Sequence, residues 1–219
     1  MNNKKLIIIL CGIVVLLGFS FGVYGHLNKK NEAVARLAQE NNSVFNRSHA
    51  PIYGAPEAKV RIVEFFDPAC ETCRAFYPLV KRIVDGYPGK VQLVVRLVPF
   101  HKGSDEAARI LIAAHRQNLF FPVTEVVLNS QDAWAAHDNP NPGRIWAFLK
   151  GTSLDAAKAR QDTGSLEARA VLDQDMADAA TLQVTRTPGF FVNGRPLTTF
   201  GHEPLKAMVD EEVKRAYPQ

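Results

Sequence analysis

The pattern of hydrophobic and polar positions begins with one long apolar run near the N-terminus. The run extends from Leu6 to Gly25 and follows the basic residues Lys4 and Lys5. A helix of that length rises about 30 Å, which is enough to cross the hydrocarbon core of a membrane. The run is longer than the apolar part of a typical cleaved signal peptide, and no clear small-residue cleavage site follows it. We therefore expect residues 1–25 to form an uncleaved membrane anchor, with a cleaved signal peptide as the competing interpretation.

Residues 26–46 are mostly polar and separate this run from the folded part of the chain. Ala33, Val34, Leu37 and Ala38 give the segment a thin apolar stripe at helical spacing. Two helical turns are too short to predict a coiled coil, so we interpret the segment as a polar stalk.

The folded domain is expected to span residues 47–219 and to open with a strand, a helix and a second strand. Val60–Phe66 is a short, almost unbroken apolar run, which is typical of a central strand buried on both faces. Apolar residues then recur on one helical face over 76–87, and Pro78 is expected to kink that helix. A second apolar strand covers 91–98. Two strands joined through a helix should be parallel, with a right-handed crossover.

Helical periodicity dominates residues 103–184, and an excursion of this length indicates a helical insertion rather than a loop. Sheet signals return over 190–200, where Asn193 and Gly194 supply the positive φ angles of a tight hairpin turn. A last apolar helical face covers 205–216. The order β-α-β, helical insertion, β-β-α predicts an α/β fold, preceded by one N-terminal transmembrane helix.

Composition and charge exclude several classes of protein. The chain has 219 residues, enough for one well-buried domain with an extension, and its net charge is +4. Its basic residues are interspersed with acidic ones, so no nucleic-acid partner is expected, because such a partner needs a clustered basic surface. Three cysteines are too few for a disulfide-rich scaffold, and the sequence lacks the ligand spacing of a zinc ribbon. One of them, Cys11, lies in the apolar run, where we expect an ordinary small apolar residue.

The other two cysteines form Cys70-Glu71-Thr72-Cys73, directly after the first predicted strand and at the start of the first helix. Unpaired amide groups and the positive end of a helix stabilise a thiolate at Cys70. A thiolate is the attacking species in disulfide exchange. Cys73, one turn further along, can close a short disulfide with Cys70. We expect Cys70 to be the nucleophile and Cys73 the resolving thiol, with half of a zinc site as the alternative for this spacing.

Glu64 is a carboxylic acid inside the first apolar strand, six residues before Cys70. Burying a carboxylate is costly, and burial raises its pKa. Glu64 is therefore a candidate proton acceptor for Cys73. The alternatives are a position near the edge of the sheet or a pair with a lysine.

Four features together resemble the DsbA family of thioredoxin-fold proteins, over about residues 45–217. They are the helical insertion, Pro78 and the segments EFFDPACETC and TRTPGFFVNG. The resemblance implies a thioredoxin-like fold and the activity of a protein dithiol-disulfide oxidoreductase. It also implies that the Cys70–Cys73 disulfide is the redox-active group, with no further cofactor and no metal.

The same resemblance implies a role for each residue of the site. Cys70 would be the exposed nucleophile and Cys73 its buried partner, and Glu64 matches the family's buried acid. Pro188 matches a cis-proline that faces the disulfide, although a proline at the start of a strand needs no function to explain it. The preceding residue, Thr187, would offer its backbone to an extended substrate by strand-like pairing.

The sequence departs from the best-known members of that family between the two cysteines, where they often have Pro-His. Glu71-Thr72 stands there instead, and the charge of Glu71 would oppose a thiolate at Cys70. Because thiolate stabilisation makes such proteins strong oxidants, we predict a weaker oxidant. Threonine before Pro188 is more typical of the family's isomerase and reductase relatives, so the direction of electron flow stays open. His101 and Lys102, after the second strand, are candidates to border the site, or are ordinary loop residues.

The sequence thus favours an oxidoreductase that exchanges disulfides with exported proteins and is reset by a membrane or periplasmic redox partner. Basic residues flank both ends of the apolar run, so the cysteine chemistry decides the orientation. The domain is expected on the periplasmic side of a bacterial inner membrane. One alternative is a thioredoxin-fold module that holds Cu(I), although the chain has only three methionines and no Met- or His-rich tract near the cysteines. The other is an inactive interaction domain, against which the intact Cys70, Cys73 and Pro188 argue.

Overall fold

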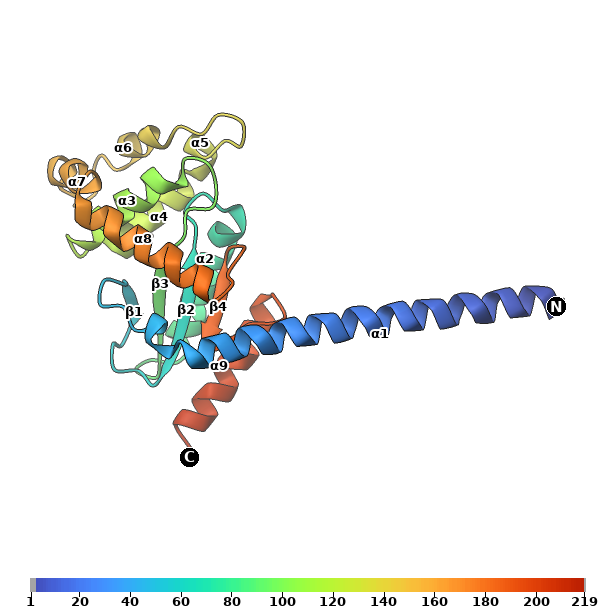
Figure 1. Cartoon of the computed structure of the whole chain (residues 1–219). Coiled ribbons are helices and arrows are strands. Elements are labelled where there is room, and N and C mark those ends of the chain that lie inside the picture. Colours follow the sequence, from blue (N-terminus) through green and yellow to red (C-terminus); the bar gives the residue numbers. More distant parts are fainter. Residues whose placement is uncertain (1–2, 219) are drawn as a thin grey trace.

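The computed structural model describes residues 3–218, apart from the side chains of residues 3–11, Val14 and Lys30. Figure 1 shows a body of helices and strands from which one long helix projects. In chain order, the elements are α1 (Asn3–Glu40), η1 (Asn42–Phe45), β1 (Ile52–Gly54), β2 (Val60–Phe66), α2 (Glu71–Asp85), β3 (Val91–Leu97), α3 (Ser104–His115), α4 (Phe120–Asn129), α5 (Gln131–Trp134), η2 (Pro142–Arg144), α6 (Ile145–Phe148), α7 (Ala156–Thr163), α8 (Leu166–Thr181), β4 (Gly189–Val192), β5 (Arg195–Pro196) and α9 (His202–Ala216).

A five-stranded mixed sheet forms the centre of the body, in the order β1-β3-β2-β4-β5. Strands β2 and β3 are parallel, as predicted, with Val60 opposite Val91. Strand β4 pairs antiparallel with β2, and Phe65 lies opposite Gly189. The antiparallel edge strand β1 was not predicted, because it has three residues and ends at a glycine with positive φ.

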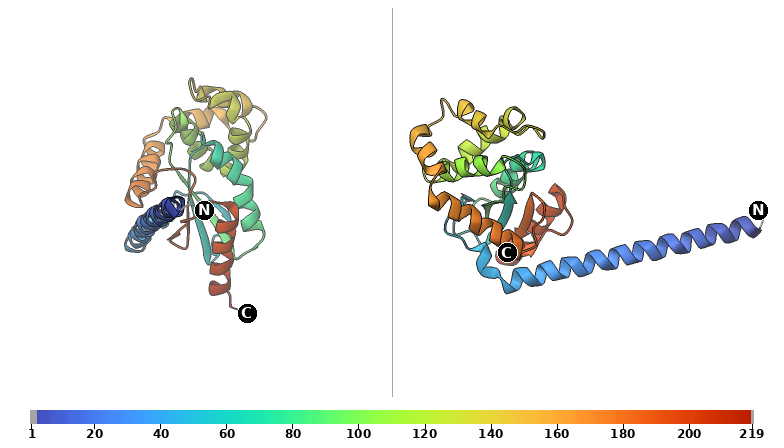
Figure 2. Two further views of the ribbon diagram at one scale, coloured as in Figure 1. Left: turned by 90° about the vertical axis from the view of Figure 1, so that its right-hand side faces the viewer. Right: turned by 45° about the horizontal axis from the view of Figure 1, so that its top comes forward.

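The apolar residues of the central strands alternate between two separate cores, which explains the unbroken apolar run of β2. Ile62 and Leu93 belong to the core that includes residues of α2 and α9. Val63 and Phe65 belong to the other, with Phe45 of η1 and residues of α1 and α8. Figure 2 shows α8 and the end of α1 on one side of the sheet and α2 and α9 on the other.

The predicted helices are present. Helix α2 is one continuous element over Glu71–Asp85 and contains Pro78, and the kink expected there stays a prediction. Helices α3 to α8 occupy Ser104–Thr181, within the predicted insertion; α3 to α7 lie beyond the carboxyl ends of β2 and β3, and α8 returns along one face of the sheet (Figure 1). The insertion therefore covers the end of the sheet at which the two cysteines are placed.

Helix α1 joins the predicted anchor and stalk in one helix that extends away from the body (Figure 1). Its last part packs on the domain, where Ala38 is buried and Val34 lies beside it. The side chains of Leu6–Cys11, which include the third cysteine, and of Val14 lie outside the described residues. Across the side chains that are described, no helix combines the length and the apolar character needed to span a membrane. The division into anchor, stalk and domain stays a prediction.

A buried ionic cluster attaches α8 and the N-terminal segment to the sheet. Arg96 of β3 is fully buried, and its guanidinium donates to Asp175 at 2.6 Å and to Asp178 at 2.5 Å. Arg47 and His49, which lie between η1 and β1, bind the same two carboxylates. The apolar surroundings of Arg96 gave no indication of this cluster, because its partners lie 79 and 82 residues away along the chain.

Candidate active site

The two cysteines lie where β2 passes into α2. Cys70 is the N-cap residue of α2, with extended backbone angles, and Cys73 lies in the first turn. Cys73 is completely buried, while Cys70 is 6% exposed. The resemblance implied an exposed nucleophile, and the structure corrects this: Cys70 is the more accessible of the two, but Thr187 lies against it. The Cys70 Sγ atom is 3.4 Å from the Thr187 carbonyl oxygen.

The surroundings of the two thiols push their pKa values in opposite directions. The pKa of Cys70 is lowered to about 5, most strongly by a hydrogen bond from the Cys73 thiol, against the effect of burial. Thr187 and the backbone N–H groups of Thr72 and Cys73 lower the pKa of Cys70 further. The pKa of Cys73 is raised well above its usual value, first by burial, then by its bond to Cys70 and by the charge of Glu64. Near pH 7 the pair therefore holds a thiolate on Cys70 and a proton on Cys73.

Glu64 lies in the middle of the sheet, between Val95 of β3 and Phe190 of β4. Its side chain is buried, with 1% of the residue exposed, and neither carboxyl oxygen has a hydrogen-bond partner. Neither alternative for Glu64 holds, because β2 is the central strand and no lysine pairs with it among the described residues. Burial, and then the charge of Cys70, raises the pKa of Glu64 to about 8.

Replacing Glu64 with glutamine should remove a pH-dependent loss of stability. The folded-state pKa of Glu64, about 8, lies above its ordinary value of 4.5, so folding favours the protonated acid. The stabilisation is complete below pH about 4.5 and is lost as the pH rises through about 8. Relative to Glu64→Gln, the reduced wild-type protein should lose a few kcal/mol of unfolding free energy over this range. Urea unfolding of both proteins at several pH values measures this pH-dependent difference in stability.

The exposed i,i+4 pair of Asp105 and Arg109 offers a control for that experiment. Asp105→Asn also removes one carboxylate, but its charge is solvated, so its stability difference from wild type should change little over the same range. If the stability difference between Glu64→Gln and wild type changes as little with pH as that of Asp105→Asn, Glu64 is not a buried acid that folds in its neutral form.

Asp67, which was not among the predicted site residues, connects two loops close to Cys70. This buried carboxylate accepts from the N–H groups of Ala69 at 2.8 Å, Phe100 at 2.7 Å and His101 at 2.9 Å. It also binds the His101 ring nitrogen at 2.7 Å and the hydroxyl of Ser104. Asp67 thereby joins the loop before Cys70 to the loop after β3. The sequence feature that could have identified Asp67 is its position as a carboxylate in the strand-to-helix loop just before Cys70.

The four residues predicted to border the site, Glu71, Thr72, His101 and Lys102, have different surroundings. Thr72 lines a groove beside Cys70. The His101 pKa is raised overall: burial lowers it most, but Asp67 and the negative charges of Cys70 and Glu71 outweigh burial. Lys102 is exposed and has no hydrogen bond or ion pair within the described part of the chain. The carboxylate of Glu71 lies 3.5 Å from the ring nitrogen of His137.

The peptide bond between Thr187 and Pro188 is cis, as the resemblance implied. Strand β4 starts at the next residue, Gly189, and its register opposite Phe65 brings this loop against the start of α2. The juxtaposition of Thr187 with Cys70 joins segments 117 residues apart.

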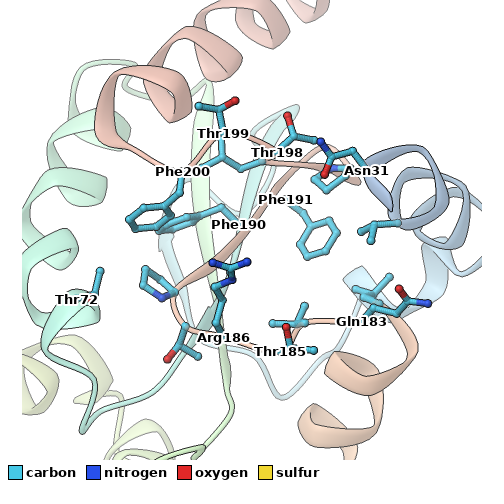
Figure 3. A pocket seen from close by; sticks show the side chains of 18 residues that line it. Asn31, Thr72, Gln183, Thr185, Arg186, Phe190, Phe191, Thr198, Thr199 and Phe200 are labelled. Carbon is cyan, nitrogen blue, oxygen red and sulfur yellow. The ribbon is translucent and has the colours of Figure 1, made fainter. Parts of the chain in front are cut away.

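A groove of about 650 Å³ runs along this loop (Figure 3). Thr72, Phe190 and Phe200 line it near the cysteines, and Asn31 and Val34 of α1 line the opposite end. Phe76 of α2 stacks on Phe200, with ring centroids 4.6 Å apart. Among the described side chains, no group of three or more His, Cys, Asp or Glu residues is arranged to hold a metal ion. The arrangement is a reactive thiolate beside a partly apolar groove.

Comparisons with known proteins agree with this geometry. A family model described as thioredoxin matches residues 46–211. A probable disulfide bond formation protein D from Bacillus anthracis is 27% identical over 98% of this chain and 99% of its own length. The crystal structure of a thioredoxin-like oxidoreductase from Silicibacter pomeroyi is 29% identical, with a TM-score of 0.67 over 82% of this chain and 98% of its own. BdbD from Bacillus subtilis, 22% identical, has the same fold, with a TM-score of 0.66 over 76% of this chain and 94% of its own. The chain therefore belongs to the thioredoxin family and, in keeping with the names of its curated relatives, is a protein dithiol-disulfide oxidoreductase.

Proposed function

We propose that this protein forms disulfides in exported proteins, using the Cys70–Cys73 pair as the oxidant. The proposal rests on the pKa values of the two thiols, which the protein shifts in opposite directions. The pKa of Cys70 is lowered to about 5, and that of Cys73 is raised well above its usual value. A thiolate that is stable at neutral pH is a good leaving group, so a mixed disulfide to Cys70 is readily resolved.

The reaction proceeds in two exchanges. A substrate thiolate attacks the Cys70 sulfur of the oxidised pair, the Cys70–Cys73 bond breaks, and Cys73 leaves with the bonding electrons. Glu64, with its pKa raised to about 8, holds a proton at neutral pH and supplies it to Cys73. A second substrate thiolate attacks the substrate sulfur, and Cys70 leaves as the stable thiolate. The substrate loses two electrons to the pair, and a redox partner must accept them to restore the disulfide.

Whether the protein acts as an oxidant depends on how strongly it stabilises the reduced, dithiol form of the cysteine pair. A nucleophile pKa of about 5 lies between the values of about 7 for thioredoxin and about 3.5 for DsbA. Stabilisation of the reduced form raises the reduction potential, so an oxidant weaker than DsbA is expected. The side chain of Glu71 is 66% exposed beside His137, so solvent screens its charge from Cys70. The name of the Bacillus anthracis relative, a disulfide bond formation protein, supports the same direction.

Two measurements on the full chain test this function, both in a Cys11→Ser background so that only the site thiols react. Equilibration with glutathione buffers should place the potential between about −270 and about −120 mV. The rate of Cys70 alkylation should rise with pH around a midpoint near 5 and level off by neutral pH. A midpoint near the ordinary thiol value of about 8.5 contradicts the activated nucleophile, and a potential near about −270 mV contradicts the direction. Tight Cu(I) binding with negligible exchange supports the copper-binding alternative.

We also propose that residues 1–25 anchor the chain in a bacterial inner membrane with the domain on the periplasmic side. Two arguments support this placement. The apolar run from Leu6 to Gly25 is long enough to cross a membrane, and disulfide exchange with exported proteins takes place outside the cytoplasm. Retention in membranes after alkaline extraction, together with protease sensitivity from the periplasmic side, checks the placement, and release into the soluble fraction contradicts it.

A further inference from the structure

The groove beside the cis-proline loop carries one charged side chain among the described residues that line it. This residue is Arg186, and the other lining residues are apolar, threonine, asparagine, glutamine or glycine. We propose that Arg186 selects substrates that carry a carboxylate side chain close to the reacting cysteine. The inference rests on the proposed function, because it assigns a substrate class to the same site.

The guanidinium of Arg186 is not used elsewhere in the fold. It is exposed and makes no ion pair or hydrogen bond with any residue that the structure describes. Arg47, Arg96 and Arg195, in contrast, each bind carboxylates. Figure 3 shows the Arg186 side chain projecting into the middle of the groove, beneath Phe190 in that view. An unpaired cation in a groove without a carboxylate is complementary to an acidic occupant.

Arg186 lies where it would hold the substrate carboxylate close to the reacting thiol, Cys70. Arg186 directly precedes Thr187, whose carbonyl oxygen is 3.4 Å from the Cys70 sulfur. Both residues lie outside the β4–β2 ladder, whose last pair is Phe65 with Gly189, so an extended substrate can pair along them. One residue of extended chain spans about 3.3 Å, so a substrate side chain within about two residues of its cysteine reaches Arg186.

The chemistry of the groove favours a carboxylate over other anions or cations. A guanidinium presents a planar fork of N–H donors that fits a carboxylate in two parallel hydrogen bonds. The aromatic rings of Phe190 and Phe200 line the same groove and reduce the local dielectric, which strengthens the ion pair. A lysine side chain in the same place would be repelled. Stabilisation of the Cys70 thiolate does not require Arg186, because its pKa is lowered by Cys73, Thr187 and backbone N–H groups.

Three synthetic dithiol peptides that differ in one residue beside the first cysteine, Asp, Asn or Lys, test the proposal. Each peptide reduces the oxidised full-length protein, and each second-order rate is divided by that peptide's rate with hydroxyethyl disulfide, which corrects for its thiol pKa. Wild-type protein should prefer the Asp peptide over the Lys peptide by about two- to fivefold, the range of an exposed ion pair. The preference should shrink as the salt concentration rises.

Charge variants distinguish recognition from a structural effect. Arg186→Gln should bring the Asp-to-Lys ratio close to one, and Arg186→Glu should reverse it. Arg169→Gln, an exposed arginine on α8 away from the groove, removes the same charge and should keep the wild-type ratio. The inference is overturned if Arg186→Gln keeps the ratio or slows all three peptides equally, or if the wild-type ratio is one. If the oxidised wild-type protein fails to oxidise even the Asn peptide, the proposed function itself fails.

Discussion

Replacing Cys70 with serine should abolish disulfide exchange, whereas replacing Cys73 with serine should leave a protein that captures disulfide-containing substrates as mixed disulfides and releases them slowly. Cys70 is the more accessible thiol and has a pKa of about 5, so it alone forms the mixed disulfide. A serine at position 70 provides no thiolate, and the buried Cys73, with its raised pKa, cannot take over. In the Cys73→Ser protein the Cys70 thiolate attacks a disulfide of the substrate and expels one substrate thiolate. Because no Cys73 thiol is present to attack the resulting mixed disulfide, only a free substrate thiol can release it.

Non-reducing electrophoresis of both variants, with mass analysis of trapped species, measures this difference. The Cys11→Ser protein is the matched control, because it also exchanges one cysteine for serine and should retain multiple turnovers. Stable mixed disulfides on the Cys70→Ser protein, in place of the Cys73→Ser protein, would reverse the assigned roles. Loss of capture by both variants with the fold intact would contradict a two-step exchange.

Replacing Arg96 with methionine should destabilise the domain more than any other single change to its ion pairs. Its guanidinium is fully buried and binds the buried carboxylates Asp175 and Asp178. Removing one partner of a buried ionic cluster leaves uncompensated charge in a dry environment, which costs about 3–5 kcal/mol. The remaining partners of these carboxylates, Arg47 and the ring of His49, lie nearer the surface and compensate in part.

The midpoint and slope of urea unfolding give this cost directly. Arg109→Met is the matched control, because Arg109 forms an exposed i,i+4 pair with Asp105, and its loss should cost less than about 1 kcal/mol. Equal costs for the two variants would show that the buried cluster does not hold α8 on the sheet. A change in slope instead of midpoint would point to a change in the unfolded state.

Elements with a strong local pattern were predictable. Strand β2 shows its two-sided burial directly in seven adjacent residues, and helix α2 shows one apolar face. The turn at Asn193 and Gly194 followed from residue type, and both have positive φ. Strand β1 was missed because three paired residues carry no periodicity.

The sequence by itself determined the chemistry of the site, because that chemistry depends on neighbours in the chain. A cysteine at a strand-to-helix junction and a second one turn later define a thiol pair with unequal surroundings. The position of Glu64 inside an apolar strand likewise made it a candidate buried acid, with an edge position or a pair with a lysine as the alternatives. These inferences require only the rise of a helix and the alternation of a strand.

Only the tertiary structure decided what surrounds the thiol pair, because each contact joins segments that are distant in sequence and carries no local signal. The contact between Cys70 and Thr187 spans 117 residues and depends on the register of β4 against β2. Asp67 reaches donors that lie 33 to 37 residues further along the chain. The exposed position of Glu71, and the place of Arg186 in a groove without carboxylates, follow from packing of the whole domain. The sequence therefore identified the reacting atoms, and the fold set their pKa values and the residues of the groove beside them.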